Sequence, residues 1–458
     1  MKKIIKCLAL VLVFALAVSI VACGSTGRKR GDKNTLNFLY IWPEHEVAMN
    51  KIITDYMAEH PGVTINPSVV PHDEVDRALQ SAYIGGTMPD VFFYWSDKVY
   101  KWVADDIPYA LNDYADGWKE DFVSDGVGWE AGKVDGNYYA IPFRSTGFLI
   151  LYNKSYFDVH PQWTIPTTLQ EFEQLIMKIQ ADEPGLIPLG AYGGSGGTMY
   201  QFQTALSIFV AICNGSVEDP NYRTGRLAPD YEDDAGAKVI DKFKSYIDAG
   251  FFGPNPHAKT REDVMADFMN GQSAMCLFNN NELGTLLEGM EEGTEIETFA
   301  IPAPAGVDAK YIYGTYDSFC VANSAPNKEL AVDFIKYLTS AEVQKEWTRT
   351  EKSIMVNKEV TYDDPVQQTL ANEMQFVGKY DIYPDYNSGD KGDINFNLLL
   401  SYLNGSYKGN ATDLLKEMDG NTVQAMRDSL LNPPDGLDWI QPTYTKKDYD
   451  DSWLNPVR

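Results

Sequence analysis

Aromatic and polar side chains follow several predicted strands of this chain, at positions where an α/β protein can present them to a ligand. Trp and Tyr rings offer flat apolar faces, whereas Asp, Glu, Asn and Arg side chains form hydrogen bonds. Together they suit a small ligand that has both polar groups and apolar faces. The candidate ligand-binding residues are Trp42, Glu44, Asp90, Tyr94, Trp95, Arg144, Asn279, Asn280, Tyr316 and Asp317.

Each candidate also has a structural role open to it. Aromatic rings usually fill a core, and the Asn run at 279–281 could simply form a turn, because Asn tolerates left-handed backbone. Asp90 could hold its loop by accepting hydrogen bonds from backbone amides. Arg144 could form a salt bridge between two domains of the chain. The sequence alone leaves both kinds of role open.

Signals for a metal, a cofactor or catalysis are weak. The five histidines are scattered and form no HExxH pair. The glycine-rich segment 193–197 lacks the Lys-Ser/Thr ending of a P-loop and the spacing of a dinucleotide fingerprint, so it reads as a ligand-facing or flexible loop. Carboxylates are abundant, but no spacing marks two of them as an acid/base pair. We therefore predict no metal, no cofactor and no enzymatic activity.

Residues 36–95 alternate between predicted strands and helices. Runs at 36–41, 63–70 and 91–95 have the composition of buried strands. Residues 46–60 and 73–84 between them have helical periodicity. Strands that alternate with helices over short loops are typical of an α/β fold with a largely parallel sheet.

The segment 134–172 marks a change of domain. A strand-like run at 138–141 is followed by Pro142, by a polar break at 144–147 and by an apolar strand at 148–152. Two strands joined without a helix suit a chain that leaves one domain and enters another. A second such crossing is expected at 274–278, which would deliver the Asn run at 279–281 to the first domain.

Five motifs follow one another in order along the chain: GTMPDVF at 86–92, DGNYYAIP at 135–142, LYNKSYF at 151–157, FMNGQSAM at 268–275, and APNKELAVDFIKYLTSAEVQ at 325–344. Together they resemble one known family, the family 1 extracellular solute-binding proteins, which are the sugar-capturing subunits of ABC importers. A Trp usual in that family is replaced near Thr168, where Leu169 follows instead.

The resemblance implies a fold and a function. The fold is the two-lobe, type II periplasmic-binding-protein-like fold, each lobe a mixed, mostly parallel sheet flanked by helices, with hinge crossings. We expect an N-lobe of residues 35–143 and 277–325 and a C-lobe of residues 144–276 and 326–458. The expected function is capture of a mono- or oligosaccharide by cleft closure and delivery to the transmembrane subunits of an ABC permease, by a protein that works as a monomer.

The N-terminus reads as a lipoprotein leader. Lys2, Lys3 and Lys6 precede an apolar run that is short for a membrane span, and the run ends in Ile-Val-Ala before Cys23. We expect a signal peptide at 1–22, a lipidated Cys23 with a flexible tether at 23–34, and anchoring to the extracytoplasmic face of the membrane. An uncleaved membrane helix is the alternative. Cys213, Cys276 and Cys320 are well separated and are expected to be buried thiols.

Net charge limits the partners. With 38 basic and 65 acidic residues the formal charge is −27, which repels phosphate backbones and disfavours nucleic acid. Three alternative functions stay open: the same fold binding a polyamine or another cation, a surface glycan hydrolase, and a scaffold lipoprotein without a ligand.

Overall fold

The computed structural model describes residues 33–103, 105–123, 127–193, 235–306, 312–374, 377–378, 397–429 and 457. The predicted leader at 1–22, Cys23, Cys213 and nearly all of the glycine-rich segment lie outside these ranges. Within them, no helix has the length and apolar character needed to cross a membrane.

The first lobe is built on three parallel strands. β1 (Thr35–Tyr40) pairs with β2 (Thr64–Val69) on one side and with β3 (Val91–Trp95) on the other, as the strand–helix alternation predicts. The connecting helices α2 (Glu46–Glu59) and α3 (Val75–Ile84) bury one face each, and α2 does so through Met49, Ile52, Ile53 and Tyr56.

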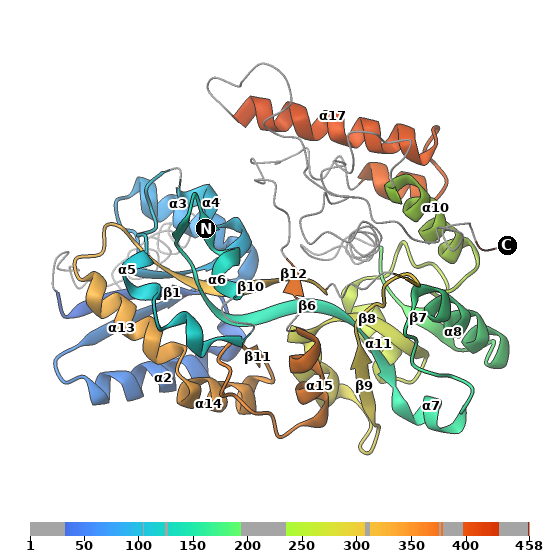
Figure 1. The fold of residues 1–458 in the computed structure, drawn as a ribbon, viewed down its shortest axis with the longest axis horizontal. Helices are drawn as coiled ribbons and strands as arrows, with labels where there is room; N and C mark the ends of the chain where they lie inside the picture. Colours follow the sequence, from blue (N-terminus) through green and yellow to red (C-terminus); the bar gives the residue numbers. More distant parts are fainter. Residues whose placement is uncertain are drawn as a thin grey trace, which may run out of the picture.

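Shorter elements complete this lobe around an aromatic core (Figure 1). They are η1 (Pro43–His45), η2 (His72–Glu74), η3 (Ser96–Lys98), α4 (Tyr100–Val103), α5 (Asn112–Ala115), η4 (Lys119–Asp121), α6 (Val127–Ala131), β4 (Lys133–Val134) and β5 (Asn137–Tyr138).

One strand runs through both lobes. β6 (Ile141–Asn153) is 13 residues long and buried at every position. Its first half pairs antiparallel with β10 (Ile312–Val321), whereas its second half pairs with β8 (Ser273–Asn279) and β9 (Ile296–Phe299). The green-blue ribbon of β6 can be followed from one lobe to the other in Figure 1. The change of domain predicted at this segment is therefore found, inside a continuous strand.

The interruption predicted at Pro142 and the break predicted at 144–147 are wrong. Pro142 lies within β6 opposite Ser318, and the register shifts beside it so that Phe143 has no opposite residue in β10. Proline lacks the N–H that a regular ladder needs, and a bulge removes that need without ending the strand.

The second lobe continues the sheet through β8 to β7 (Ile187–Gly190), which run parallel. Thr168 caps α8 by accepting a hydrogen bond from the Glu171 amide, and Leu169 is buried where a Trp is usual in the resembled family. The helices of this lobe are α7 (Lys154–Val159), α8 (Leu169–Asp182), α10 (Ala235–Asp248), α11 (Arg261–Met269), η6 (Asn280–Glu282), α12 (Leu283–Gly289), α15 (Pro365–Glu373), a helix at 397–403, and α17 (Ala411–Ser429).

The lobe boundaries differ from those expected. The 277–299 stretch stays in the second lobe, because β8 and β9 both pair with the second half of β6. Conversely, α13 (Lys328–Leu338) and α14 (Ala341–Glu351) pack on α2 of the first lobe, where the Phe334 ring lies 5.2 Å from that of Phe38. The crossing expected at 274–278 is not found there, and the chain is back in the first lobe where β10 pairs with β3.

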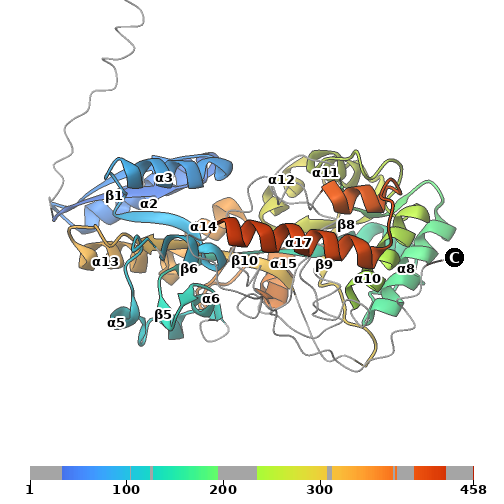
Figure 2. The ribbon, with the colours of Figure 1, turned by 90° about the horizontal axis from the view of Figure 1, so that it is seen from above.

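A third connection and a helical cap complete the fold. After α14 the chain forms β11 (Ile354–Met355), which pairs with β6, and then α15, which contacts β9 of the second lobe. β12 (Val377–Gly378) pairs with the start of β10. The Tyr402 hydroxyl donates to Asp241 Oδ1 at 2.5 Å and so ties the 397–403 helix to α10. Figure 2 shows α17 running from this corner of the second lobe toward the first.

Candidate functional site

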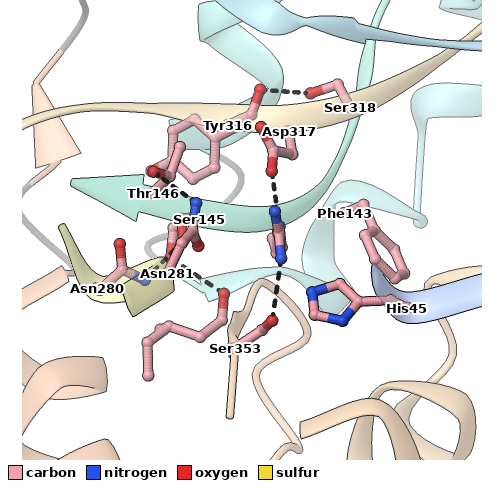
Figure 3. Close-up of polar contacts among 12 residues, drawn as sticks. His45, Phe143, Ser145, Thr146, Asn280, Asn281, Tyr316, Asp317, Ser318 and Ser353 are labelled. Carbon is pink, nitrogen blue, oxygen red and sulfur yellow. Dashed lines mark hydrogen bonds and ion pairs between the residues drawn. The ribbon is translucent and has the colours of Figure 1, made fainter. Parts of the chain in front are cut away.

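The three connections between the lobes meet at one guanidinium. Arg144 lies on β6, and its Nε donates to Asp317 Oδ2 of β10 at 2.6 Å. Its Nη1 donates to the hydroxyl of Ser353, next to β11, at 3.2 Å (Figure 3). All three residues are buried. Arg144 thus forms an ion pair, but not the one between lobes that was considered for it, because Asp317 lies opposite Arg144 in the part of β10 that also pairs with Trp95 of β3 in the first lobe.

Trp42 lies next to Arg144, and these two residues together with Asp317 and Ser353 are called the hinge cluster. The Arg144 Cζ lies 4.5 Å from the centre of the Trp42 ring, which is a cation–π geometry. The ring also packs against Phe143 at 5.6 Å and Trp347 at 5.7 Å between ring centroids, and Trp42 is only 3% exposed. The ring of nearby His45 contacts the carboxylate of Glu351 at the end of α14 through Nδ1. Trp42 is therefore a core residue beneath the hinge in this structure.

The other first-lobe candidates are held by their neighbours. Tyr94 is fully buried and donates its hydroxyl to Asp76 Oδ1 at 2.6 Å. Trp95 is 8% exposed and lies between His72 and Lys98.

Asp90 and Glu44 have opposite environments. Asp90 is buried, and its Oδ2 accepts hydrogen bonds from Asn37 N at 2.7 Å and Asn37 Nδ2 at 3.0 Å, so it joins β3 to β1. This is the loop-holding role considered for it. The side chain of Glu44 on η1 is 61% exposed.

Tyr316 packs tightly against α6. A Cβ placed on Gly128 would lie 3.2 Å from Tyr316 Cδ1 and 3.0 Å from Pro142 Cβ, so a side chain there would require these neighbours to move by a few tenths of an ångström. Tyr316 is 4% exposed, and burial raises the pKa of its hydroxyl.

A group of amide side chains borders the hinge on the second lobe. Asn280 Oδ1 accepts from Gly147 N at 2.7 Å, and its Nδ2 donates to the Ser145 carbonyl at 3.0 Å. Asn280 thus pairs with the backbone of β6 as a neighbouring strand would (Figure 3). Asn279 Oδ1 accepts from Thr146 Oγ1 at 3.2 Å. The structure therefore brings Asn279 and Asn280 to the hinge together with Arg144 and Asp317.

Sequence reasoning missed Thr146, Asn281, Glu282 and Ser353. Thr146 fell in the segment interpreted as a break, although a polar residue inside a buried strand is itself a signal of function. Ser353 stands in no motif. The GGSGG run at 193–197 also fits the GxSxG pattern of serine hydrolases formally, and of it only Gly193 is among the described residues.

Glu282 is a largely buried acid next to this group, with its side chain 11% exposed. Its Oε2 accepts the backbone N–H of Asn279 at 3.1 Å, and Arg261 Nε lies 3.8 Å from its other oxygen. Burial raises the pKa of Glu282 to about 7, against the hydrogen bond from Asn279 and the charge of Arg261, which lower it. The buried thiol of Cys276 is another neighbour, and its pKa is raised by burial and by Glu282. Cys276 and Cys320 are both free and buried, as expected.

Away from the hinge, the described ranges contain a groove but no arrangement of side chains that could hold a metal ion. No group of three His, Cys, Asp or Glu side chains in these ranges is arranged to hold a metal ion. A groove of about 770 Å³ lies between α8 and α10, and its lining includes Met177, Asp241, Lys244 and Phe251. None of its lining residues belongs to the hinge cluster.

Comparisons with known proteins define the class. The described fold is that of a two-lobe binding protein, and residues 42–345 match the family model for bacterial extracellular solute-binding proteins. This match spans more than half of the chain, so the chain belongs to that family.

Individual relatives agree with this assignment. A binding protein of Brucella abortus is 26% identical over 320 residues, covering 66% of this chain and 71% of the relative. The multiple sugar-binding protein of Streptococcus mutans is 23% identical over 389 residues, covering 81% and 87%. Among solved structures, the sugar-binding protein MalE of Xanthomonas citri has a TM-score of 0.73 at 16% identity, over 86% of this chain and 98% of that one.

We predict that Arg144→Met lowers the free energy of unfolding by about 3–5 kcal/mol, because it leaves the Asp317 carboxylate buried without its partner. Urea denaturation measures this change. Arg349→Met is the matched control, since Arg349 is 65% exposed and its pair with Glu346 is worth at most about 1 kcal/mol. Equal losses in the two variants would contradict the buried ion pair.

Glu282→Gln should change how stability depends on pH. The folded pKa of Glu282 lies above that of the unfolded chain, so the wild type loses stability as pH rises from about 4.5 to about 7. Gln keeps an acceptor for Asn279 without the charge. The variant should match the wild type at pH 5 and exceed it by up to about 3 kcal/mol at pH 8. A constant difference across this range would show that Glu282 does not titrate there.

Proposed function

We propose that this chain captures a carbohydrate outside the cell and delivers it to the permease of an ABC importer. The family supports a solute-binding role, and the names of similar proteins support sugar: the Streptococcus relative is a multiple sugar-binding protein. Similar structures include a raffinose complex and a chitin oligosaccharide binding protein, at TM-scores of 0.66 and 0.69. The observation that carries the proposal is this family match together with hydrogen-bonding groups from both lobes at the hinge.

The proposed mechanism is hinge closure. Carboxyl ends of parallel strands from both lobes, β1 and β3 in one and β8 in the other, approach the hinge, and ligands of open α/β sheets bind outside such ends. A ligand that contacts both lobes only when they are closed shifts the population toward the closed form.

The candidate residues have two proposed roles, one at the hinge and one in binding the ligand. Arg144 and Asp317 bind each other and, in this proposal, keep the connections together during closure. In the same proposal, Glu44, Trp95 and Asn279 supply contacts to the ligand. Nothing in this mechanism changes a covalent bond of the sugar, so the protein acts as a carrier and not as an enzyme.

We also propose that Cys23 anchors the protein to the outer face of the cell membrane. Two or more acyl chains on one cysteine give stable anchoring, which a single chain does not. The tether at 24–34, rich in Gly and charge, would leave the lobes free to move.

Binding can be tested by thermal shift on the mature chain with maltose, raffinose, chitobiose, xylotriose and spermidine. At least one sugar should raise the melting temperature, because a ligand that binds only the folded state stabilises it. The same sugar should reduce the radius of gyration in X-ray scattering and should be recovered without new reducing ends. A shift with spermidine alone would favour a cation-binding protein, and hydrolysed sugar would favour an enzyme.

Cys23→Ala should release the protein from the membrane fraction into the medium or periplasm, because the thiol that receives the lipid is lost. Cys7→Ala is the matched control and should leave the protein in the membrane fraction, since Cys7 lies in the leader. Fractionation followed by immunoblotting measures both. Retention of the Cys23 variant in the membrane would instead support an uncleaved membrane helix.

A further inference from the structure

Asn279 belongs to a closed ring of hydrogen bonds. Its Oδ1 accepts from the backbone N–H of Asn281 at 3.0 Å and from the hydroxyl of Thr146 at 3.2 Å. Asn281 Nδ2 in turn donates to Thr146 Oγ1 at 3.0 Å. The three residues come from the end of β8, from η6 and from the centre of β6, so the ring joins the second lobe to the hinge strand.

The ring fixes the orientation of the Asn279 amide. Thr146 Oγ1 already accepts from Asn281, so its own hydrogen is free to donate to Asn279. The backbone N–H of Asn281 can only donate. A flipped Asn279 amide would set its NH₂ group against that N–H, with donor facing donor. The oxygen of Asn279 is therefore held by the ring, and the NH₂ group points away from these two donors.

Among the described residues this NH₂ group has no partner. Asn279 is 3% exposed, and its Nδ2 is buried without a hydrogen bond to any residue of the described ranges. The other amides of the run are paired: Asn280 through both of its polar atoms and Asn281 through its Nδ2. Buried polar atoms without partners are rare in folded proteins, and each asks for an explanation.

The position of Asn279 points to a ligand as the missing partner. Asn279 is the last residue of β8, opposite Phe148, and the neighbouring residue Gly147 faces Gly314 of β10. It thus lies where the partners of β6 change from first-lobe to second-lobe strands. The carboxyl end of a strand at such a switch is where open α/β sheets bind ligands.

We propose that Asn279 Nδ2 donates a hydrogen bond to an oxygen atom of the ligand and selects for ligands that carry an acceptor there. A sugar hydroxyl or ring oxygen can accept this bond. A protonated amine has donors only and leaves the Asn279 donor unpaired. This inference rests on the proposed carbohydrate function and deepens it, because it names the group that separates sugars from polyamines.

A ligand bound at Asn279 would also be connected to the hinge strand β6. Thr146, which holds the Asn279 oxygen, faces Thr315 across the β6–β10 ladder and lies two residues from Arg144. A ligand oxygen at Asn279 would therefore be linked by two side chains to the strand that joins the lobes.

The test compares two substitutions at Asn279 for affinity toward the sugar of the panel above that binds the wild type. Asn279→Asp keeps an oxygen for the ring and replaces the donor with a second acceptor. Asn279→Ser keeps a hydroxyl that can cap η6 and adds no charge, so it serves if the Asp variant folds poorly. Asn270→Asp is the control, since Asn270 is exposed at the end of α11 and outside the ring.

Isothermal titration calorimetry on folded variants measures the outcome. Both Asn279 variants should bind the sugar at least about 10-fold more weakly, as expected when a buried donor to the ligand is lost. The Asn270 control should stay within about 2-fold. Affinities within about 2-fold for a folded Asn279 variant would overturn this inference while leaving the carbohydrate function intact. A wild type that binds none of the sugars would overturn the carbohydrate function itself, and this inference with it.

Discussion

The ion pair between Arg144 and Asp317 is the constraint on which the arrangement of the two lobes depends. Three separate stretches of chain pass between the lobes, and Arg144 holds one end of each through β6, Asp317 and Ser353. A guanidinium suits this place because it is planar and offers several donors in fixed directions. Buried charges of this kind stabilise little in total, since desolvation opposes attraction, but they disfavour arrangements that separate the partners.

Around this ion pair the hinge combines tightly packed contacts with hydrogen bonds that can rearrange. The first-lobe side consists of packed aromatic rings, those of Trp42, Phe143 and Trp347. On the second-lobe side the contacts are hydrogen bonds among amides and hydroxyls, and Glu282 accepts a hydrogen bond from the backbone of Asn279. Aromatic packing resists deformation, whereas hydrogen bonds of this kind can exchange partners. A binding protein that closes needs both properties within a short distance.

Much of this architecture could be predicted from the sequence. Periodicity located α2, α8 and α13, and the motif order gave the family that the comparisons confirm. The errors have physical causes. Pro142 was interpreted as a break because a bulge that tolerates proline depends on β10, which lies about 170 residues later. The placement of α13 and α14 failed because helices with one apolar face fit either lobe equally well. The open donor of Asn279 is a property of three-dimensional contacts, and no residue pattern encodes it.

The unbroken course of β6 has a further consequence for how this protein can be divided. Neither lobe has a complete sheet by itself, because β6 contributes its first half to one lobe and its second half to the other. Separating the lobes between Gly147 and Phe148 would give each fragment a truncated strand with exposed backbone groups, the kind of edge that promotes aggregation. The two lobes therefore form one unit, and a fusion protein or a shortened chain must contain both of them.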